Sequence, residues 1–205
     1  MSALTFNEIQ LDALREMSNI GMGHAATALS QMLGETIYIR VPKATVTDVA
    51  KVPELLGGAE KLVAGVVLQV LGDARGLVLM VFPEDSVMEL LRRVVSRTPS
   101  QQVLDEIEES TLKEIGNILA SAYLGALGSL VNKTLIPSTP QFAYDMVGAV
   151  IDAVLGDLIQ QSEQAVMLEA VVYGSDPSQT DLSGHFFLIP DRESLDTLFE
   201  AIGVT

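Results

Sequence analysis

The feature that most constrains this chain is a short pattern that occurs twice, 98 residues apart. In each copy a short polar residue is followed four positions later by Glu and three positions after that by Asn, and a proline follows each Asn at the same distance. The residues are Asp12, Glu16, Asn19 and Pro42 in the first copy, and Ser110, Glu114, Asn117 and Pro140 in the second. A chain that repeats itself at this interval is expected to contain two similar structural units.

The first copy lies in a stretch with helical periodicity. At 100° per residue, Asp12, Glu16, Asn19, Gly23 and Ser30 share one narrow stripe of a helix. The residues expected on the opposite, core-facing side are Leu11, Leu14, Met17, Gly21, Ala25, Ala28, Leu29 and Met32. We therefore predict that Glu16 and Asn19 point away from the core.

The second copy has the same periodicity. Ser110, Glu114, Asn117, Ser121 and Gly128 form the polar stripe. The residues expected to face the core are Leu112, Ile115, Leu119, Tyr123, Ala126, Leu127 and Leu130. In both copies a small residue follows the Asn one turn later, so we expect a carboxylate and a carboxamide above a low surface that another protein can approach closely.

Glu and Asn are also ordinary solvated residues on exposed helical faces, and this alternative suits a single copy well. Asn, however, is a mediocre helix former, because its side chain competes for backbone hydrogen bonds. Its recurrence in register at Asn19 and Asn117 favours a functional role over the alternative.

The rest of the pattern predicts the secondary structure of each half. The first expected helix covers residues 7–33, capped by Asn7, stopped by Gly34 and loosened or kinked at Gly21 and Gly23. A turn or single helical turn is expected at 53–58. Further helices are expected at 84–97, 105–130 and most of 144–155, with a last helix opened by 190–193. The expected strands cover residues 36–41 (ended by Pro42), 46–49, 62–71, 76–82, 133–136, 163–173 and 183–189. Residues 62–71 with 76–82, and 163–173 with 183–189, are expected to form β-hairpins.

These elements predict a single domain over residues 1–205, made of two repeats at about 6–97 and 104–203. The fold class is α/β of the α+β type: a pseudo-two-fold internal duplication with a mainly antiparallel sheet packed with long helices. Residues 98–102, which are polar and contain proline, form the only plausible boundary between the halves, and they are too few for a free linker.

Composition limits the partners. The net charge of −15 argues against nucleic acid and anionic membranes and favours a basic partner surface. The chain has no cysteine, which excludes disulfides and thiolate sites and fits a reducing cytoplasm. The first residues do not resemble a targeting signal, and no apolar run approaches the roughly 20 residues that span a bilayer. We expect a cytoplasmic protein without a membrane anchor.

The sequence contains few residues for a metal site, a catalytic triad or a phosphate-binding loop. Only His24 and His185 are present, so a zinc site or a Ser-His-Asp arrangement is not expected, and each histidine is predicted to be structural or exposed. The residues Gly21-Met22-Gly23 do not form a phosphate loop, because they lie within a helical run and no Lys-Ser or Lys-Thr follows. Methionines such as Met17 and Met80 are expected to pack in the core.

Two Glu/Asn pairs without a nucleophile or a strong base suit only certain reactions. A carboxamide cannot take a proton at neutral pH, but it can orient a water molecule by accepting and donating hydrogen bonds at once. Such a group can assist a substrate that is already prone to hydrolyse, such as an acyl phosphate, by placing water in line with the phosphorus. The Glu three residues earlier could then hold a cationic group of a protein-sized substrate.

These residues resemble the CheC/CheX/FliY family of chemotaxis phosphatases. The family pattern is Asp or Ser, three residues, Glu, two residues, Asn, about 22 residues and Pro, and both copies meet it. The flanking residues 16–28 and 113–118 also resemble the family, and the resemblance extends over nearly the whole chain. Two intact motifs in a chain of this length are most similar to the CheC type.

The resemblance implies an enzyme that dephosphorylates phospho-CheY, a response regulator carrying a phospho-aspartate. By motif position, Asn19 and Asn117 take the water-orienting role, and Glu16 and Glu114 contact a lysine of the regulator. The residues given a supporting role are Asp12, Ser110, Pro42 and Pro140. No cofactor is expected on this chain, and the Mg²⁺ belongs to the regulator. CheD, a receptor deamidase, is an implied partner, and the alternative is a non-catalytic module that binds CheD or a regulator without useful turnover.

Overall fold

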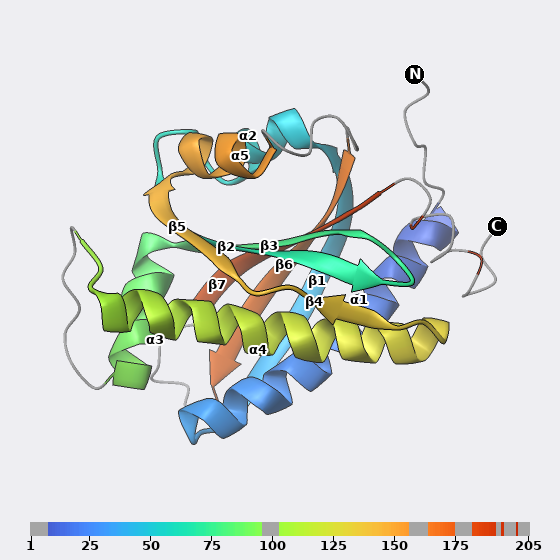
Figure 1. The fold of residues 1–205 in the computed structure, drawn as a ribbon, viewed down its shortest axis with the longest axis horizontal. Coiled ribbons are helices and arrows are strands. Elements are labelled where there is room, and N and C mark those ends of the chain that lie inside the picture. Colours follow the sequence, from blue (N-terminus) through green and yellow to red (C-terminus); the bar gives the residue numbers. More distant parts are fainter. Residues whose placement is uncertain are drawn as a thin grey trace.

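The computed structural model describes residues 8–95, 103–155, 164–174 and 182–191, together with Ser194 and Glu200. A seven-stranded antiparallel sheet forms the middle layer, with helices on both faces (Figure 1). The helical elements are α1 (Glu8–Leu33), a 3-10 turn η1 (Val49–Lys51), α2 (Val52–Leu55), α3 (Glu84–Val95), α4 (Glu106–Val131) and α5 (Val147–Leu155). The strands are β1 (Ile37–Asp48), β2 (Leu62–Gly72), β3 (Gly76–Pro83), β4 (Leu135–Pro137), β5 (Gln141–Met146), β6 (Gln164–Gly174) and β7 (Leu182–Pro190).

The order of the strands reveals how the two halves are joined. The sheet runs β1-β6-β7-β3-β2-β4, and β5 pairs with β2 beside β4. The order is the same from either end when β1 is matched with β4 and β5, β6 with β2, and β7 with β3. Strand β1 of the first half therefore pairs with β6 of the second, and β4 and β5 of the second half pair with β2 of the first. The predicted pseudo-two-fold duplication with a mainly antiparallel sheet is confirmed.

Two apolar clusters fill the space on either side of the sheet. Ala64, Val66 and Leu68 of β2 point to one face, where they pack with α1, α3 and α4. Val63 and the residues that alternate with the first set point to the other face, toward α2 and α5. Strands β2 and β3 are buried along most of their length because both of their faces are covered. This explains their nearly continuous apolar sequence.

The helices α1 and α4 lie side by side and run in opposite directions (Figure 1). Gly21 lies against the ring of Tyr123, where a Cβ atom would come within 2.6 Å of Cδ2. Helix α1 runs from Glu8 to Leu33 without interruption, so neither Gly21 nor Gly23 breaks it. Gly21 instead lets the second helix approach closely, whereas Gly23 is exposed, and a Cβ atom added there would meet no neighbouring atom within 4 Å.

Pro42 does not end the first strand, contrary to the sequence-based expectation. Strand β1 continues through it from Ile37 to Asp48, and the register against β6 shifts between Arg40 and Lys43. Proline is tolerated in a sheet on edge strands and at bulges, and β1 offers both conditions. The two short strands expected at 36–41 and 46–49 are therefore one strand.

The segment expected to be mostly helical at 144–155 begins with a strand. Residues 141–146 form β5, which pairs with β2 from Leu62↔Met146 to Val67↔Gln141, and only Val147–Leu155 is helix. A short apolar run does not distinguish a strand from a buried helix, so the long-range pairing decides.

Two residues of α4 depart from the predicted faces. Gly128, expected on the polar stripe, is buried, because the chain folds back there and the carbonyl of Lys133 lies 2.5 Å from where a Cβ would be. Leu130, expected in the core, is 43% exposed. Both lie in the last turn, where contacts beyond the helix override its periodicity.

Helix α4 also qualifies the expectation about membrane segments. Among the described helices it is the one long and apolar enough to cross a bilayer, and 56% of its apolar window is buried inside the protein, as in a core helix. The predicted cap at Asn7, the boundary at 98–102 and most of the last helix lie outside the described residues.

Candidate functional site

Helix α1 presents the first Glu/Asn pair on its outer face. Glu16 is exposed and Asn19 is half-buried, one turn further along. Glu16 makes no ion pair or hydrogen bond with any described residue. Asp12 is also exposed, and its carboxylate pairs with Arg15 at 3.2 Å. The neighbouring cation is therefore already paired, and the Glu16 carboxylate is available to a cation from outside.

Helix α4 presents the second pair in the same way. Glu114 is exposed without an ion pair in the described part of the chain, and Asn117 is half-buried. Here the preceding cation, Lys113, pairs with Glu109 at 2.5 Å, and Ser110 is exposed. The start of α4 is fixed by a capping box in which the Asp105 carboxylate accepts hydrogen bonds from two main-chain amides.

The carboxamide of Asn19 has a fixed orientation. Its Oδ1 accepts a hydrogen bond from the main-chain N–H of Val41 at 3.1 Å, which brings the motif on α1 next to the residue before Pro42. An amide nitrogen can only donate, so the atom facing Val41 must be the oxygen, and Nδ2 is the free end. The side chain of Pro42 lies outside the described residues; Pro140, its counterpart, is half-buried between β4 and β5.

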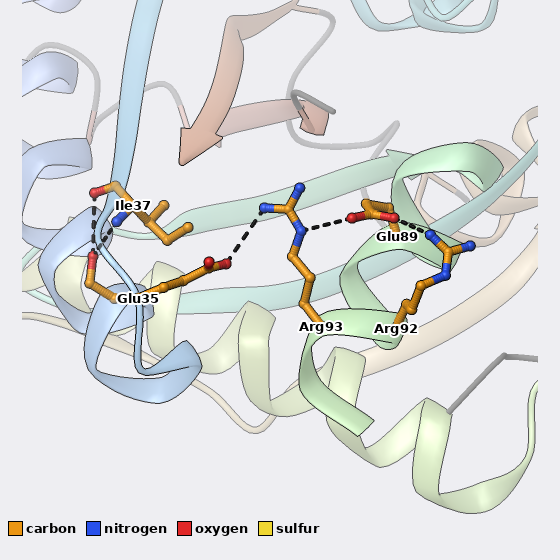
Figure 2. Close-up of polar contacts among 6 residues, drawn as sticks. Glu35, Ile37, Glu89, Arg92 and Arg93 are labelled. Carbon is orange, nitrogen blue, oxygen red and sulfur yellow. Dashed lines mark hydrogen bonds and ion pairs between the residues drawn. The ribbon is translucent and has the colours of Figure 1, made fainter. Parts of the chain in front are cut away.

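The turn between α1 and β1 is held at two places. The hydroxyl of Ser30 accepts from the N–H of Ile37 at 2.8 Å. Figure 2 shows the second connection, in which Glu35 pairs with Arg93 of α3 at 3.6 Å and Arg93 Nε donates to Glu89 at 2.9 Å. The Arg93 side chain is only 10% exposed, so this ion pair is partly shielded from solvent. These contacts keep β1 in place along α1.

Beneath the first motif, Ser18 connects the two long helices. Its hydroxyl donates to the carbonyl of Leu14 at 2.6 Å and lies 3.4 Å from the hydroxyl of Tyr123. Because the single Ser18 proton is used toward Leu14, the Tyr123 hydroxyl is the donor in the second bond. Burial raises the pKa of Tyr123 to about 12. Tyr123 is therefore a neutral donor at physiological pH.

The described residues include no group of three or more His, Cys, Asp or Glu that could hold a metal ion. His24 is exposed on α1, and His185 is half-buried on β7. Each Glu/Asn pair offers a carboxylate, which can attract a cation, and a carboxamide, which can orient a water molecule or an oxyanion.

The structure brings Asn19 together with the strand segment that contains Pro42, and Glu16 lies one turn earlier on the same helix. Sequence reasoning missed the main-chain amide of Val41. A backbone group has no side-chain signature, and the only signal for it is the proline that follows, which marks a place where ladder pairing is interrupted.

Comparison with known proteins gives a consistent picture. The model of the CheC-like family matches residues 9–46 and 107–144, two segments that begin 98 residues apart. A relative from Bacillus subtilis (strain 168), named CheY-P phosphatase CheC, is 35% identical over 202 residues, which cover 97% of this chain and 96% of the relative.

Solved structures share the fold. The structure of Thermotoga maritima FliY matches with a TM-score of 0.74 at 20% identity, covering 98% of this chain and 100% of that one. A chain of the CheX-CheY-BeF3-Mg complex from Borrelia burgdorferi matches with a TM-score of 0.52 at 14% identity, covering 84% of this chain and 96% of that one. At these identities the structures support the fold alone.

Proposed function

The chain belongs to the CheC-like family, and we propose that it is a phosphatase that hydrolyses the phospho-aspartate of the response regulator CheY. The observation that carries the proposal is the repeated placement of an exposed Glu and a half-buried Asn one turn apart on α1 and on α4. The name of the Bacillus subtilis relative and the presence of CheY in the Borrelia burgdorferi complex support the choice of substrate.

In the proposed reaction, Asn19 or Asn117 orients the attacking water. The water oxygen bonds to phosphorus while the bond from phosphorus to the aspartate carboxyl oxygen breaks, which leaves inorganic phosphate and a free carboxylate. The carboxamide donates through Nδ2 and accepts through Oδ1, so it can hold a water in line without taking its proton. The Mg²⁺ that neutralises the phosphoryl oxygens is proposed to belong to the regulator.

Glu16 and Glu114 are proposed to bind a lysine of the regulator. Both carboxylates lack an internal ion pair among the described residues, and the chain carries a net charge of −15. A surface pair of this kind contributes roughly 0.2–1 kcal/mol, and more where the interface excludes water. We therefore expect the carboxylates to affect regulator binding more than the chemical step.

CheD is proposed as a second partner because the CheC type is expected to pair with it. The competing function is a non-catalytic module that binds CheD or a regulator. The acidic surface disfavours nucleic acid and anionic membranes as partners. The two functions are distinguished by turnover of phosphorylated CheY. The two half-buried carboxamides favour the enzyme, because a binding module does not require them.

The test is the decay of phosphorylated CheY with Mg²⁺, comparing the parent with the double variant Asn19→Ala, Asn117→Ala. We expect the parent to accelerate the loss of acyl phosphate and the double variant to lose this acceleration, because no group is left to orient the water. Binding of the double variant to beryllofluoride-activated CheY should stay within about threefold of the parent.

A second pair of variants tests the carboxylates. Glu16→Gln with Glu114→Gln should raise the CheY concentration at half-maximal rate while leaving the maximal rate within about twofold. Glu54→Gln removes one exposed carboxylate on α2, across the sheet, and is the control matched to each single Glu→Gln change. A parent that leaves decay unchanged, with and without CheD, would make the binding module the better account.

A further inference from the structure

The bond to Asn19 depends on an irregularity in the sheet. Strand β1 pairs with β6 up to Arg40↔Val171 and resumes at Lys43↔Glu169. Two residues, Val41 and Pro42, therefore oppose the single residue Ala170. This arrangement is a β-bulge, which leaves part of the strand outside the regular ladder. Proline has no N–H, so Val41 supplies the only main-chain donor of the bulge, and that donor bonds to Asn19 Oδ1 at 3.1 Å.

We propose that the main-chain N–H of Val41 is a positioning group for Asn19 in the phosphatase reaction, an inference that rests on the function proposed above. The side-chain amide of Asn can flip, which swaps the positions of its oxygen and nitrogen atoms. The bond with Val41 fixes one orientation, so that Nδ2 faces the phosphoryl group and Oδ1 keeps a second lone pair for the water. The rotation is restricted before the regulator binds, which lowers the entropy cost of the reactive arrangement.

The second copy lacks this arrangement. The counterpart of Val41 is Thr139, which lies in the break between β4 and β5. Ser138 is bonded to Gln69 of β2 twice, because its N–H donates to the Gln69 carbonyl and its hydroxyl accepts from the Gln69 N–H, both at 2.9 Å. These bonds hold the segment to the sheet edge, and among the described residues Thr139 donates no hydrogen bond to Asn117. The two sites are therefore unequal, and the first is the pre-organised one.

Amide hydrogen exchange tests the tether without any assay of activity. In the parent, the Val41 amide should exchange slowly, and Asn19→Ala should speed its exchange at least tenfold. Asn19→Asp keeps an acceptor oxygen and should retain the protection, and Asn117→Ala is the matched control that should not affect Val41. Equally slow exchange in the parent and in Asn19→Ala would overturn the inference, because the N–H would then have another partner.

Replacement of the Val41 amide by an ester tests the role in the reaction. The ester, introduced as the α-hydroxy analogue of valine, removes the N–H and keeps the buried side chain. In an Asn117→Ala background, where only the first site works, we expect a maximal rate about fivefold to tenfold lower, with the half-saturating CheY concentration unchanged. The same replacement at Thr139 in an Asn19→Ala background should change the rate less than twofold.

The outcomes separate this inference from the proposed function. The inference would be overturned if the Val41 ester had an unchanged or higher maximal rate in a protein that still unfolds cooperatively on heating. The bond would then contribute nothing to the reaction or would slow it, and the proposed phosphatase function would stand. If neither the parent nor the Asn117→Ala variant accelerates CheY dephosphorylation, the proposed function fails together with the catalytic meaning of the tether. The exchange measurement still decides whether the tether exists.

Discussion

The two Glu/Asn motifs occupy equivalent places in the two halves, yet their surroundings differ. After α1 the chain forms one strand, β1, with a bulge at Val41 and Pro42. After α4 the equivalent twelve positions are divided into β4 and β5, with a break at 138–140. The same spacing therefore places a helix and a returning strand in both halves. The residues in between decide the hydrogen bonds, since Ser138 stands where the first copy has Arg40.

The charged neighbours differ in a similar way. The cation before Glu16 is paired with Asp12 on the motif stripe, whereas the cation before Glu114 is paired with Glu109, one position away from Ser110. In both copies the neighbouring cation forms an ion pair with an acid of the same helix, and among the described residues the motif Glu has no cationic partner. Different acids therefore pair with the cation in the two copies: Asp12 of the motif in the first, and Glu109 beside Ser110 in the second.

The largest difference between the two sites is expected in the maximal rate of CheY dephosphorylation when either asparagine is replaced. Each single variant leaves one working site, so Asn19→Ala reports on the second site and Asn117→Ala on the first. Because Asn19 is held by Val41, we expect Asn19→Ala to remove the larger share of the maximal rate of CheY dephosphorylation. Equal losses in the two variants would mean that the difference in hydrogen bonding has no consequence for turnover.

The next effect concerns the packing under the first motif. Gly21→Ala places a methyl group 2.6 Å from the rigid ring of Tyr123 and should lower the free energy of unfolding by about 1–3 kcal/mol. Gly23→Ala, two residues away and exposed, is the matched control and should raise it by up to about 1 kcal/mol through helix propensity. Urea denaturation measures both.

The second motif has its close contact at a different position. Gly116→Ala would bring a methyl group within 2.5 Å of Val66 Cγ1 and should cost a similar amount, with Gly125→Ala as the exposed control. If Gly21→Ala and Gly116→Ala were both as stable as their controls, the helices would have room to adjust, and close approach would not explain these glycines.

The smallest expected effect is a dependence on alkaline pH. The pKa of Tyr123 is about 12 in the folded protein and about 10 in an unfolded chain, so the stability that it contributes is complete below pH 10 and is lost as the pH rises toward 12. At pH 11 the free energy of unfolding should be lower by about 1.4 kcal/mol than below pH 10 from this group.

Denaturation at pH 8 and pH 11 tests this expectation. Tyr123→Phe should remove that part of the pH dependence, and Ser18→Ala should retain it, because the phenol stays buried. The bond between Ser18 and Tyr123 exists only under the first motif, since Gly116 takes the place of Ser18 in the second copy. An identical pH dependence in the parent and in Tyr123→Phe would contradict the buried titration.

The periodicity of the sequence predicted the outward-facing Glu16 and Glu114 and the core positions of α1 well, because one helix face depends only on local spacing. The same reasoning failed wherever a distant partner decides. Pro42 passes within a strand because β1 is an edge strand with a bulge opposite β6, and neither fact can be derived from neighbouring residues. Residues 141–146 are a strand because β2 lies beside them.

The candidate site was predictable to a similar extent. The duplication made Glu16, Asn19, Glu114 and Asn117 the candidate side chains, and the repeated interval to Pro42 and Pro140 pointed to a second segment. The identity of the atom that this segment contributes, an amide hydrogen of Val41, emerges only once the strand has a neighbour. The sequence therefore allowed the candidate side chains to be chosen, but it did not reveal the main-chain N–H of Val41 that bonds to Asn19.

The exchange of outer strands between the halves links the unfolding of one half to that of the other. Within the described residues, strand β1, whose Val41 bonds to Asn19, pairs in the sheet with β6 of the other half alone, and β4 and β5 pair with β2 in the same way. Each motif helix is therefore followed by a strand that needs the other half as its neighbour in the sheet. We expect the two halves to unfold together, because separating them would leave β1 without β6 and β4 and β5 without β2.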